Sequence, residues 1–410
     1  MRSFKETSKG VKAILCALVV LMVIGFGCWI AQQVYGLGIT GMSNGTSWGL
    51  YICLFLLFVG LSAGGLIVAA AGSVFHVEDY EKVALPAVVT SISCILAAGA
   101  LVLVDLGGAY RIWRMFTGPN FMSPLVWDMS VISLYIAMNV IELAFLVSKK
   151  PDARHKQWIA SCVALPVAFL VHSVTAWILG LQIGRDWYSS IMAPLFVVSA
   201  MDSGLALLLL GLFALKKNGI FKTPRRIVSK LAVLLATTIA LDAYFVGCEL
   251  LSSAFPQEEH VLMTLHEMLA GATAPAFWIE VVCLLVAFVM LASRKRRANM
   301  RIVGCASALV VLSVLCKRIW LLFTSFIHPN IAYGPGISSG SLSARQSAGD
   351  AIWATASTYM PTIPEIFVAL AVVSFGGFLF IVLTHVLVPK WREAHPAAAA
   401  SLDGEVAAEA

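Results

Sequence analysis

The stretch WGLYICLFLLFVGLSAGGLIVAAAGSVF, residues 48–75, contains no charged side chain. An α-helix rises 1.5 Å per residue, so about 20 apolar residues are needed to cross the roughly 30 Å hydrocarbon core of a membrane. The stretch exceeds that length and is therefore predicted to be a membrane-spanning helix.

The rest of the chain has the same character. Its 410 residues are 60% hydrophobic and only 12% charged, with a mean hydropathy of +0.89, which excludes a soluble globular protein. The first apolar run follows basic residues but lacks a small-x-small cleavage site, so we interpret it as a retained anchor rather than a signal peptide. We predict an all-α polytopic membrane protein with ten transmembrane helices, near 11–34, 48–75, 83–106, 128–148, 158–180, 192–215, 229–251, 271–293, 301–325 and 363–388.

Two similar segments indicate an internal repeat. They are LFVGLSAGG (57–65) and LFVVSAMDSG (195–204), and each opens a group of four predicted spans. Four is an even number, so the two groups have the same orientation, unlike the inverted repeats of many secondary transporters. We expect two parallel-repeat four-helix bundles, spans two to five and six to nine, flanked by spans one and ten. The small residues in both segments either allow close helix approach or serve only general packing.

These expectations divide the chain into six parts. A long outer connection rich in Gly and Ser is typical of a disordered or docking segment. The parts are an N-terminal anchor helix (1–47), a first four-helix bundle (48–182), a second four-helix bundle (183–325), a docking loop (326–362), the last transmembrane helix (363–389) and a disordered cytoplasmic tail (390–410).

Basic residues are distributed unevenly between the two sides of the membrane. Ten spans place both termini on one side, and 22 of the 28 Lys and Arg residues fall on that side. Because basic flanking loops stay in the cytoplasm, both termini are predicted to be cytoplasmic. The net charge of +6 results from this asymmetry and does not indicate a nucleic-acid partner. Four other basic residues lie on the opposite side, namely Arg111, Arg114, Arg185 and Arg345. The remaining two, Lys317 and Arg318, lie inside the ninth span.

The cysteines and histidines limit the redox groups that the chain could hold. All nine cysteines lie in apolar spans and no two are spaced as CxxC, which argues against an iron–sulfur cluster, a CxxCH haem attachment and a disulfide framework. A membrane haem of b type needs two axial ligands at one depth, whereas His172 and His385 lie at opposite depths. We therefore expect no bound haem, iron–sulfur cluster or other metal. Any electron transfer would need a diffusible organic carrier and a partner subunit.

Ionisable side chains lie inside several spans, where each costs on the order of 3 kcal/mol or more. They either pair with one another and only fix helix register, or they bind substrate and move protons. A carboxyl such as Glu142, with no basic residue nearby in its own span, can carry a proton near neutral pH. A histidine such as His172 can exchange a proton as well, or it can be satisfied by a neighbouring Ser or Thr. The charged positions are Asp105, Glu142 and His172 in the first bundle, and Asp202, Asp242, Glu280, Lys317 and Arg318 in the second.

The segment DLGGAYRIWRMF, residues 105–116, follows the third span. Its acid and first arginine would lie at the outer membrane surface, where two glycines let the chain turn and Trp113 and Phe116 anchor at the interface. This position suits an amphipathic ring that enters from the lipid and exchanges two electrons and two protons. A quinone headgroup fits that description.

Four motifs occur in a distinctive order: SWGLYICLFLLFVGLSAGG (47–65), DLGGAYRIWRMFTGPNFMSPLVWD (105–128), PLFVVSAMDSG (194–204) and YMPTIPE (359–365). Together they resemble the NrfD/PsrC family of integral membrane subunits, found in polysulfide reductase, menaquinone reductase and alternative complex III. The resemblance covers the chain from the second span to the tenth, and the added first and last spans are similar to the ten-helix branch of that family.

The resemblance implies a quinone-interacting integral membrane subunit of a multi-subunit respiratory oxidoreductase in the bacterial cytoplasmic (inner) membrane. Such a protein exchanges electrons between menaquinone or menaquinol, its substrate, and a periplasmic iron–sulfur (ferredoxin-like) subunit. A multihaem cytochrome c, a molybdopterin-type subunit or both would be further partners. The chain would be the quinone-site subunit of the complex or non-catalytic alone, and proton uptake or translocation could accompany the reaction.

The resemblance also implies a set of site residues. The quinone site would lie near the outer face of the first bundle, with Asp105 and His172 handling protons and Arg111 holding Asp105 ionised or binding a carbonyl oxygen. The residues that would line the site are Trp48, Asp105, Arg111, Tyr135 and His172. The proton-handling residues would be Asp105, His172 and Glu142, with Glu142 extending a route toward the cytoplasm, and a second route would use Asp202, Asp242, Glu280 and Lys317.

One part of the chain departs from the family pattern. The family loop commonly reads Asp-x-Gly-Arg-Pro-x-Arg, whereas DLGGAYR has Gly108 and Ala109 where Arg and Pro are usual. The acid and the last arginine are kept, but one positive charge and the stiffness of proline are lost.

Two other classes of function remain open from the sequence. A proton-coupled secondary transporter could use the same buried acids. The parallel repeat, and the absence of helices broken by Pro or Gly at corresponding positions of the two groups, count weakly against this function. A purely structural membrane anchor would use its buried charges only for assembly.

Overall fold

The computed structural model describes residues 9–329 and 357–408. Within these ranges ten helices are long and apolar enough to cross a membrane, and the structure contains no strand. The predicted all-α polytopic fold is confirmed. The ten helices are α1 (Lys9–Tyr35), α2 (Leu50–Val74), α4 (Ala84–Asp105), α6 (Pro124–Leu146), α7 (Ala153–Gly180), α8 (Met192–Lys217), α9 (Arg225–Ala254), α11 (Ala274–Ala292), α13 (Met300–Ile327) and α15 (Ile363–Ala394).

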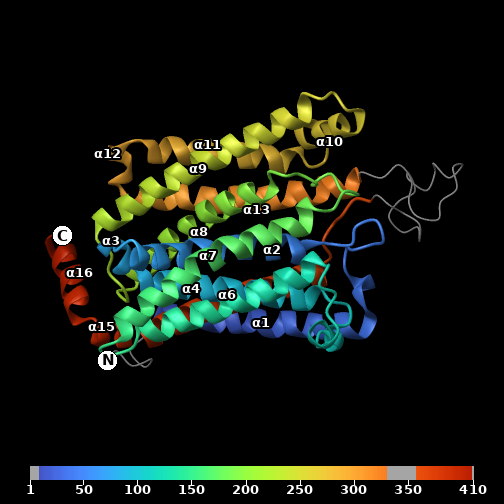
Figure 1. Cartoon of the computed structure of the whole chain (residues 1–410). Coiled ribbons are helices and arrows are strands. Elements are labelled where there is room, and N and C mark those ends of the chain that lie inside the picture. The colour runs from blue at the N-terminus through green and yellow to red at the C-terminus, as the bar shows by residue number, and fades with distance from the viewer. Residues whose placement is uncertain (1–8, 330–356, 409–410) are drawn as a thin grey trace, which may run out of the picture.

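The long helices run side by side, and the two described ends of the chain lie at the same end of the assembly (Figure 1). We call that end, which carries the α2–α4, α6–α7, α8–α9 and α11–α13 connections, the terminal face. The opposite end, which carries the other connections, is the far face. Short helices in the connections are η2 (Leu37–Ile39), α3 (Glu78–Glu81), η3 (Ala109–Arg111), α5 (Arg114–Thr117), α10 (Glu259–Ala270) and α12 (Arg294–Arg297).

The helices fall into two groups with the same internal contacts. In the first group α2 packs against α4 and α7, α6 packs against α7, and α4 contacts α6. In the second group α8, α9, α11 and α13 repeat these contacts in the same chain order. The contacts of the two groups thus correspond, and the parallel repeat itself stays a prediction. The flanking helices α1 and α15 pack against each other, and α15 packs on α4 beside the first group.

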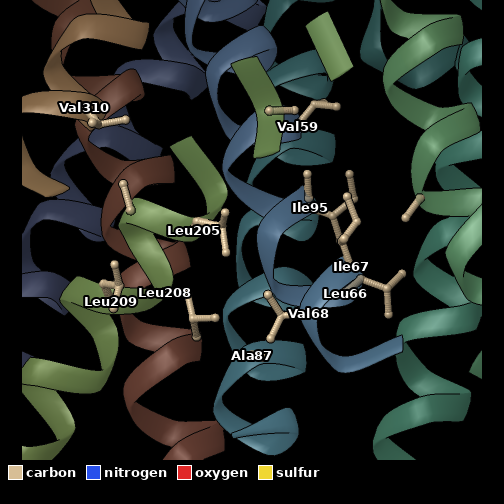
Figure 2. Packing of buried hydrophobic residues seen from close by; sticks show 14 of the residues in the cluster. Val59, Leu66, Ile67, Val68, Ala87, Ile95, Leu205, Leu208, Leu209 and Val310 are labelled. Atoms are coloured by element: carbon tan, nitrogen blue, oxygen red, sulfur yellow. The ribbon is translucent and has the colours of Figure 1, made fainter. Parts of the chain in front are cut away.

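The two groups meet along α2 and α8. A Cβ atom added at Gly204 would meet the backbone of Gly64, and one added at Gly64 would meet the backbone of Gly204 and Leu205. Both glycines belong to the two similar segments, which therefore supply both sides of this close helix approach. Figure 2 shows apolar side chains around this region, including Val59 of α2 and Leu205 of α8, packed between the helices.

Residues 396–408 form a helix, α16 (Pro396–Ala408), which corrects the prediction of a disordered tail. The helix lies across the terminal face (Figure 1). Leu402 is buried, Arg392 pairs with Asp403 at 3.1 Å, and Lys82 pairs with Glu405 at 2.8 Å. The ion pair with Lys82 holds the pKa of Glu405 below its ordinary value. An Ala-rich segment therefore becomes helical because it has a surface to pack on. Residues 330–356 of the predicted docking loop lie outside the described residues.

The substitution Gly204→Ala tests the α2–α8 contact. The added methyl group would overlap the Gly64 backbone, and overpacking of this kind costs about 1–3 kcal/mol. We expect a lower midpoint of thermal unfolding for the purified protein in mild detergent. The matched control is Gly99→Ala, where the new Cβ meets open space and the midpoint should stay or rise. Equal midpoints for the two variants would contradict the proposed role of the contact.

Candidate functional site

The first candidate region lies where α4 ends at the far face. The helix ends at Asp105 because Leu106 adopts an extended conformation. Asp105 Oδ1 is buried and has no hydrogen-bond partner among the described residues. Glu365, at the start of α15, is the charged group whose field acts on it. A buried carboxylate oxygen without a partner is costly, so this position suits an occupant that donates a hydrogen bond.

Glu365 of α15 connects the start of α2, the α1–α2 connection and the segment before α15. Its Oε2 accepts a hydrogen bond from Gly41 N at 2.9 Å, and its Oε1 accepts from Leu50 N at 3.3 Å and from the hydroxyl of Tyr359. The Glu365 side chain also belongs to a capping box with Thr362. This fully buried acid is absent from the predicted site residues. The Thr-x-x-Glu pattern in YMPTIPE was the local signal that could have identified it.

A second chain of hydrogen bonds fixes the backbone next to Asp105. Tyr51 of α2 donates to Gln32 Oε1 at 2.9 Å, and Gln32 Nε2 of α1 donates to Val104 O at 2.6 Å. Both side chains are buried. These two hydrogen bonds link α1, α2 and α4 at Val104, one residue before Asp105. They therefore hold the backbone that carries the carboxylate in place.

The loop after α4 places its arginines away from that carboxylate. Arg111 is exposed and lies over the Tyr110 ring at 5.0 Å, and Arg114 lies over the Trp113 ring at 5.7 Å. In the part of the chain that the structure describes, no ion pair joins Arg111 to Asp105. The loop therefore presents cations and aromatic rings on the far face.

Trp48 occupies a different place from Asp105. It stacks on Trp187 with ring centroids 5.8 Å apart, and Trp187 meets Phe326 edge to face. Arg185 lies over the Phe326 ring at 4.5 Å. Trp48 thus contacts the α7–α8 connection, and Trp187 in turn contacts the end of α13, at the boundary between the two helix groups.

Tyr135 and His172 lie together in the interior of the first group. Their ring centroids are 6.5 Å apart, edge to face. The Tyr135 hydroxyl bonds Ser91 Oγ and donates to Ser62 O, each at 2.9 Å, whereas His172 Nε2 is buried with no partner among the described residues. Ser91 lies 14 residues before Asp105 on α4, which is about 21 Å along the helix axis. Of the predicted quinone residues, Tyr135 and His172 thus pack against each other, and Tyr135 bonds α4 about 21 Å along that helix from Asp105.

Tyr135 belongs to a buried polar file on one face of α6. Asp128 accepts a hydrogen bond from Thr175 of α7 at 2.5 Å, and Glu142 accepts one from Ser161 of α7 at 2.6 Å. Positions 128, 135, 139 and 142 lie on one helix face because they are seven, four and three residues apart. The file extends about 21 Å, from near the far face to near the terminal face. Asp128 was missed because it lies at the very start of its predicted span.

The second helix group holds a buried ionic cluster. Lys317 Nζ lies 2.8 Å from Asp242 Oδ1 and 3.6 Å from Glu280 Oε1, and Trp320 Nε1 donates to Glu280. All of these charged side chains are at most 1% exposed. The two acids compensate the desolvation of the lysine, which is the arrangement that a buried cation requires.

Two further buried charges lie near this cluster. Both carboxylate oxygens of Asp202 are buried without a partner among the described residues. Arg318 donates to Ser199 Oγ at 3.3 Å and lies 3.8 Å over the Phe196 ring. Arg318 of α13 therefore contacts α8 through both of these residues.

A polar opening lies above the cluster at the far face. A cavity of about 460 Å³ is lined by Asp186, Glu249 and His260, and a smaller one of about 70 Å³ extends from Asp186 and Glu249 to Trp320. Burial raises the pKa of Asp186, which lies 3.7 Å from His260 Nε2. The titratable side chains of Asp186 and Glu249 thus lie on the far-face side of Trp320, which is hydrogen-bonded to Glu280.

Comparison with known proteins agrees with this architecture. The sequence model of a protein family described as "Polysulphide reductase, NrfD" matches residues 38–330. The chain is 38% identical to a putative membrane subunit of a dimethyl sulfoxide reductase from Halobacterium salinarum, over 95% of this chain and 94% of that protein.

Two more distant relatives are also matched over most of their own length. A subunit of the selenate reductase of Mesobacillus selenatarsenatis is 26% identical, over 72% of this chain and 78% of that protein. The "Hdr-like menaquinol oxidoreductase integral membrane subunit" of Archaeoglobus fulgidus is also 26% identical, over 80% of this chain and 83% of that protein. With its ten spans and the family match over most of its length, the chain belongs to the NrfD family of integral membrane proteins.

Proposed function

We propose that the chain is the quinone-interacting membrane subunit of a respiratory oxidoreductase, exchanging electrons between menaquinone or menaquinol and a peripheral iron–sulfur subunit at the far face. Family membership supports the general role, and two relatives are named for menaquinol or menaquinone. The observation that carries the proposal is Asp105 Oδ1, a buried and unpartnered carboxylate oxygen, among the described residues, at the far-face end of α4.

The chemistry of the exchange assigns a role to that carboxylate. Reduction of a quinone adds two electrons and two protons, and oxidation of a quinol releases them. The electrons pass to or from the partner, so this chain has to bind the ring and to exchange its protons. In the protonated form Asp105 would donate a hydrogen bond to a carbonyl oxygen, and in the ionised form it would accept one from a hydroxyl.

The polar file of α6 and α7 provides a route for protons through the first group. Asp128, His172 and Glu142 follow one another from near the far face to near the terminal face. Glu142 Oε2 and His172 Nε2 both lack a partner among the described residues, so each is free to exchange a proton with water or with a neighbour in the file. Such a file could deliver protons to the quinone or carry them across.

The second group would supply another route. Asp202, Asp242, Glu280 and Lys317 lie in its interior, and the cavities at Asp186 and Glu249 lead toward them from the far face. Movement of protons between these acids would change the pairing of Lys317.

The charge distribution supports an orientation. Because basic connections stay in the cytoplasm, the terminal face would be cytoplasmic and the far face periplasmic, in a bacterial inner membrane. The aromatic and basic loop of residues 109–122 would then face the iron–sulfur protein. The docking loop at 326–362 stays a prediction, since residues 330–356 lie outside the described ones. A multihaem cytochrome c or a molybdopterin-type subunit would complete the electron path.

The first experiment is mass spectrometry of proteins that copurify with a tagged chain in mild detergent. A cysteine-rich iron–sulfur protein, with or without a haem or molybdenum subunit, is the expected result. A stable preparation of the chain alone would contradict the proposal and would favour a proton-coupled transporter.

Asp105→Asn and His172→Ala should each leave the complex assembled but lower quinone-linked electron transfer at least tenfold, which corresponds to about 1.4 kcal/mol. The reason is that each change removes a proton-exchanging group while leaving the helix contacts in place. The measurement is turnover of the purified complex with a quinone or quinol. The controls are Asp152→Asn and His155→Ala, which make similar changes at exposed positions. Full turnover in both site variants would show that the site is misplaced.

Lys317→Met tests the ionic cluster. It would leave Asp242 and Glu280 as uncompensated buried acids, and breaking such a pair typically costs about 3–5 kcal/mol. Adding Asp242→Asn should recover part of the lost stability, because one of the two unpaired charges is then removed. Thermal unfolding of the two variants in the same detergent measures the difference. If the double variant is the less stable one, the pairing is not what stabilises the cluster.

A further inference from the structure

A membrane-facing groove lies beside the Asp105 region. It has a volume of about 620 Å³ and is bounded by α1, α4 and α15, with Ala109 and Tyr110 at its far-face end. Pockets for small organic ligands have volumes of roughly 300–1,000 Å³. The groove is therefore large enough for one extended apolar molecule.

The groove opens toward lipid rather than toward water. Phe26 of α1 and Leu103 of α4 line it and are 58% and 41% exposed. Both lie on long apolar helices, on the surface that the bilayer covers. An occupant could therefore enter from the membrane without crossing an aqueous phase.

The groove changes in polarity along its length. Trp29 Nε1 and Gln33 Nε2 line it one helical turn apart, and both are buried with no partner among the described residues. Met22 and Ala371, deeper in the groove, are apolar. Positions 22 and 33 are about 16 Å apart along α1. The groove thus matches a molecule with a hydrogen-bonding head near the far face and an apolar chain pointing into the bilayer.

The two nitrogens distinguish between possible occupants. A buried donor without an acceptor is costly, so an occupant with acceptor oxygens at that level is favoured. An acyl chain has no acceptor at any level. The ring of a quinone has two carbonyl oxygens, and its isoprenoid chain would fill the apolar part.

The groove also adjoins the proposed site. Val104 lines its wall, and the carbonyl of Val104 accepts the hydrogen bond from Gln32 that continues to Tyr51. The next residue along α4 is Asp105, whose Oδ1 lacks a partner among the described residues. A ring at the head of the groove would therefore lie next to the carboxylate that has to exchange protons with it.

We propose that this groove is the membrane entrance of the Asp105 site and that it holds the isoprenoid chain of the quinone. The inference rests on the proposed function, and it adds the route of entry, the site of the chain and the roles of α1 and α15. Trp29 and Gln33 are binding residues for the headgroup.

The test fills the groove and compares two substrates. Ala100→Phe places a large ring in the groove wall, and Ala17→Phe makes the same change on an exposed part of α1 that does not line the groove. The intact complex is assayed with a long-chain menaquinol and with a naphthoquinol that has no chain. For Ala100→Phe we expect KM for the long-chain substrate to rise at least tenfold and kcat/KM for the chainless one to stay within twofold. Ala17→Phe should match the unaltered complex with both.

Three outcomes would overturn the inference, and they are distinguishable. Unchanged kinetics with both substrates in Ala100→Phe would show that the chain lies elsewhere. An equal loss with both would show that the groove does not select for the chain. If the unaltered complex turns over neither substrate, the proposed function itself fails.

A second measurement does not depend on the folding of a variant. A menaquinone analogue with a photoreactive diazirine at the end of a short isoprenoid chain is irradiated with the unaltered complex, and the labelled peptides are identified. Labelling should fall on peptides around Met22 and Phe375, and an excess of long-chain menaquinone should suppress it. Labelling confined to other helices would contradict the assignment of the groove.

Discussion

The contact between Gly64 of α2 and Gly204 of α8 is the constraint on which the rest of the structure depends. In a bilayer no hydrophobic driving force brings helices together, so close backbone packing has to supply the attraction. The contact makes α2 and α8 the shared centre, and each then carries its own set of three helices. Two residues before Gly64 on this central helix, the carbonyl of Ser62 accepts a hydrogen bond from the Tyr135 hydroxyl of α6.

The two helix groups satisfy their buried polar groups in different ways. In the second group Lys317 is neutralised by Asp242 and Glu280, so the cost of burying one cation is offset by two acids. In the first group Asp128 and Glu142 accept hydrogen bonds from the uncharged side chains of Thr175 and Ser161. Acids with neutral partners can change protonation without breaking an ion pair. This difference is why the first group is the better candidate for direct exchange of protons with a substrate.

The sequence was sufficient for the ten spans and for the segments that carry the α2–α8 contact, because apolar length and repeated small residues are local signals. It was not sufficient for the partners of the buried acids. Glu365 bonds Gly41 and Leu50, which lie more than 300 residues away, and no local pattern encodes such a contact. The family resemblance implied that Arg111 holds Asp105 ionised or binds a carbonyl oxygen, but the loop turns the arginine outward over Tyr110.

The flanking helices α1 and α15 determine the surroundings of Asp105 at the end of α4. On the side of the first group, α15 packs on α4 and α1 packs on α15. They also bring Gln32 and Glu365 to the neighbourhood of Asp105, and together with α4 they form the walls of the groove. A carboxylate at a bare helix end would be in contact with headgroups and water. At the end of α4 it lies instead one residue from the wall of an apolar groove that is open to the membrane, which is the basis of the proposed entry of a hydrophobic carrier.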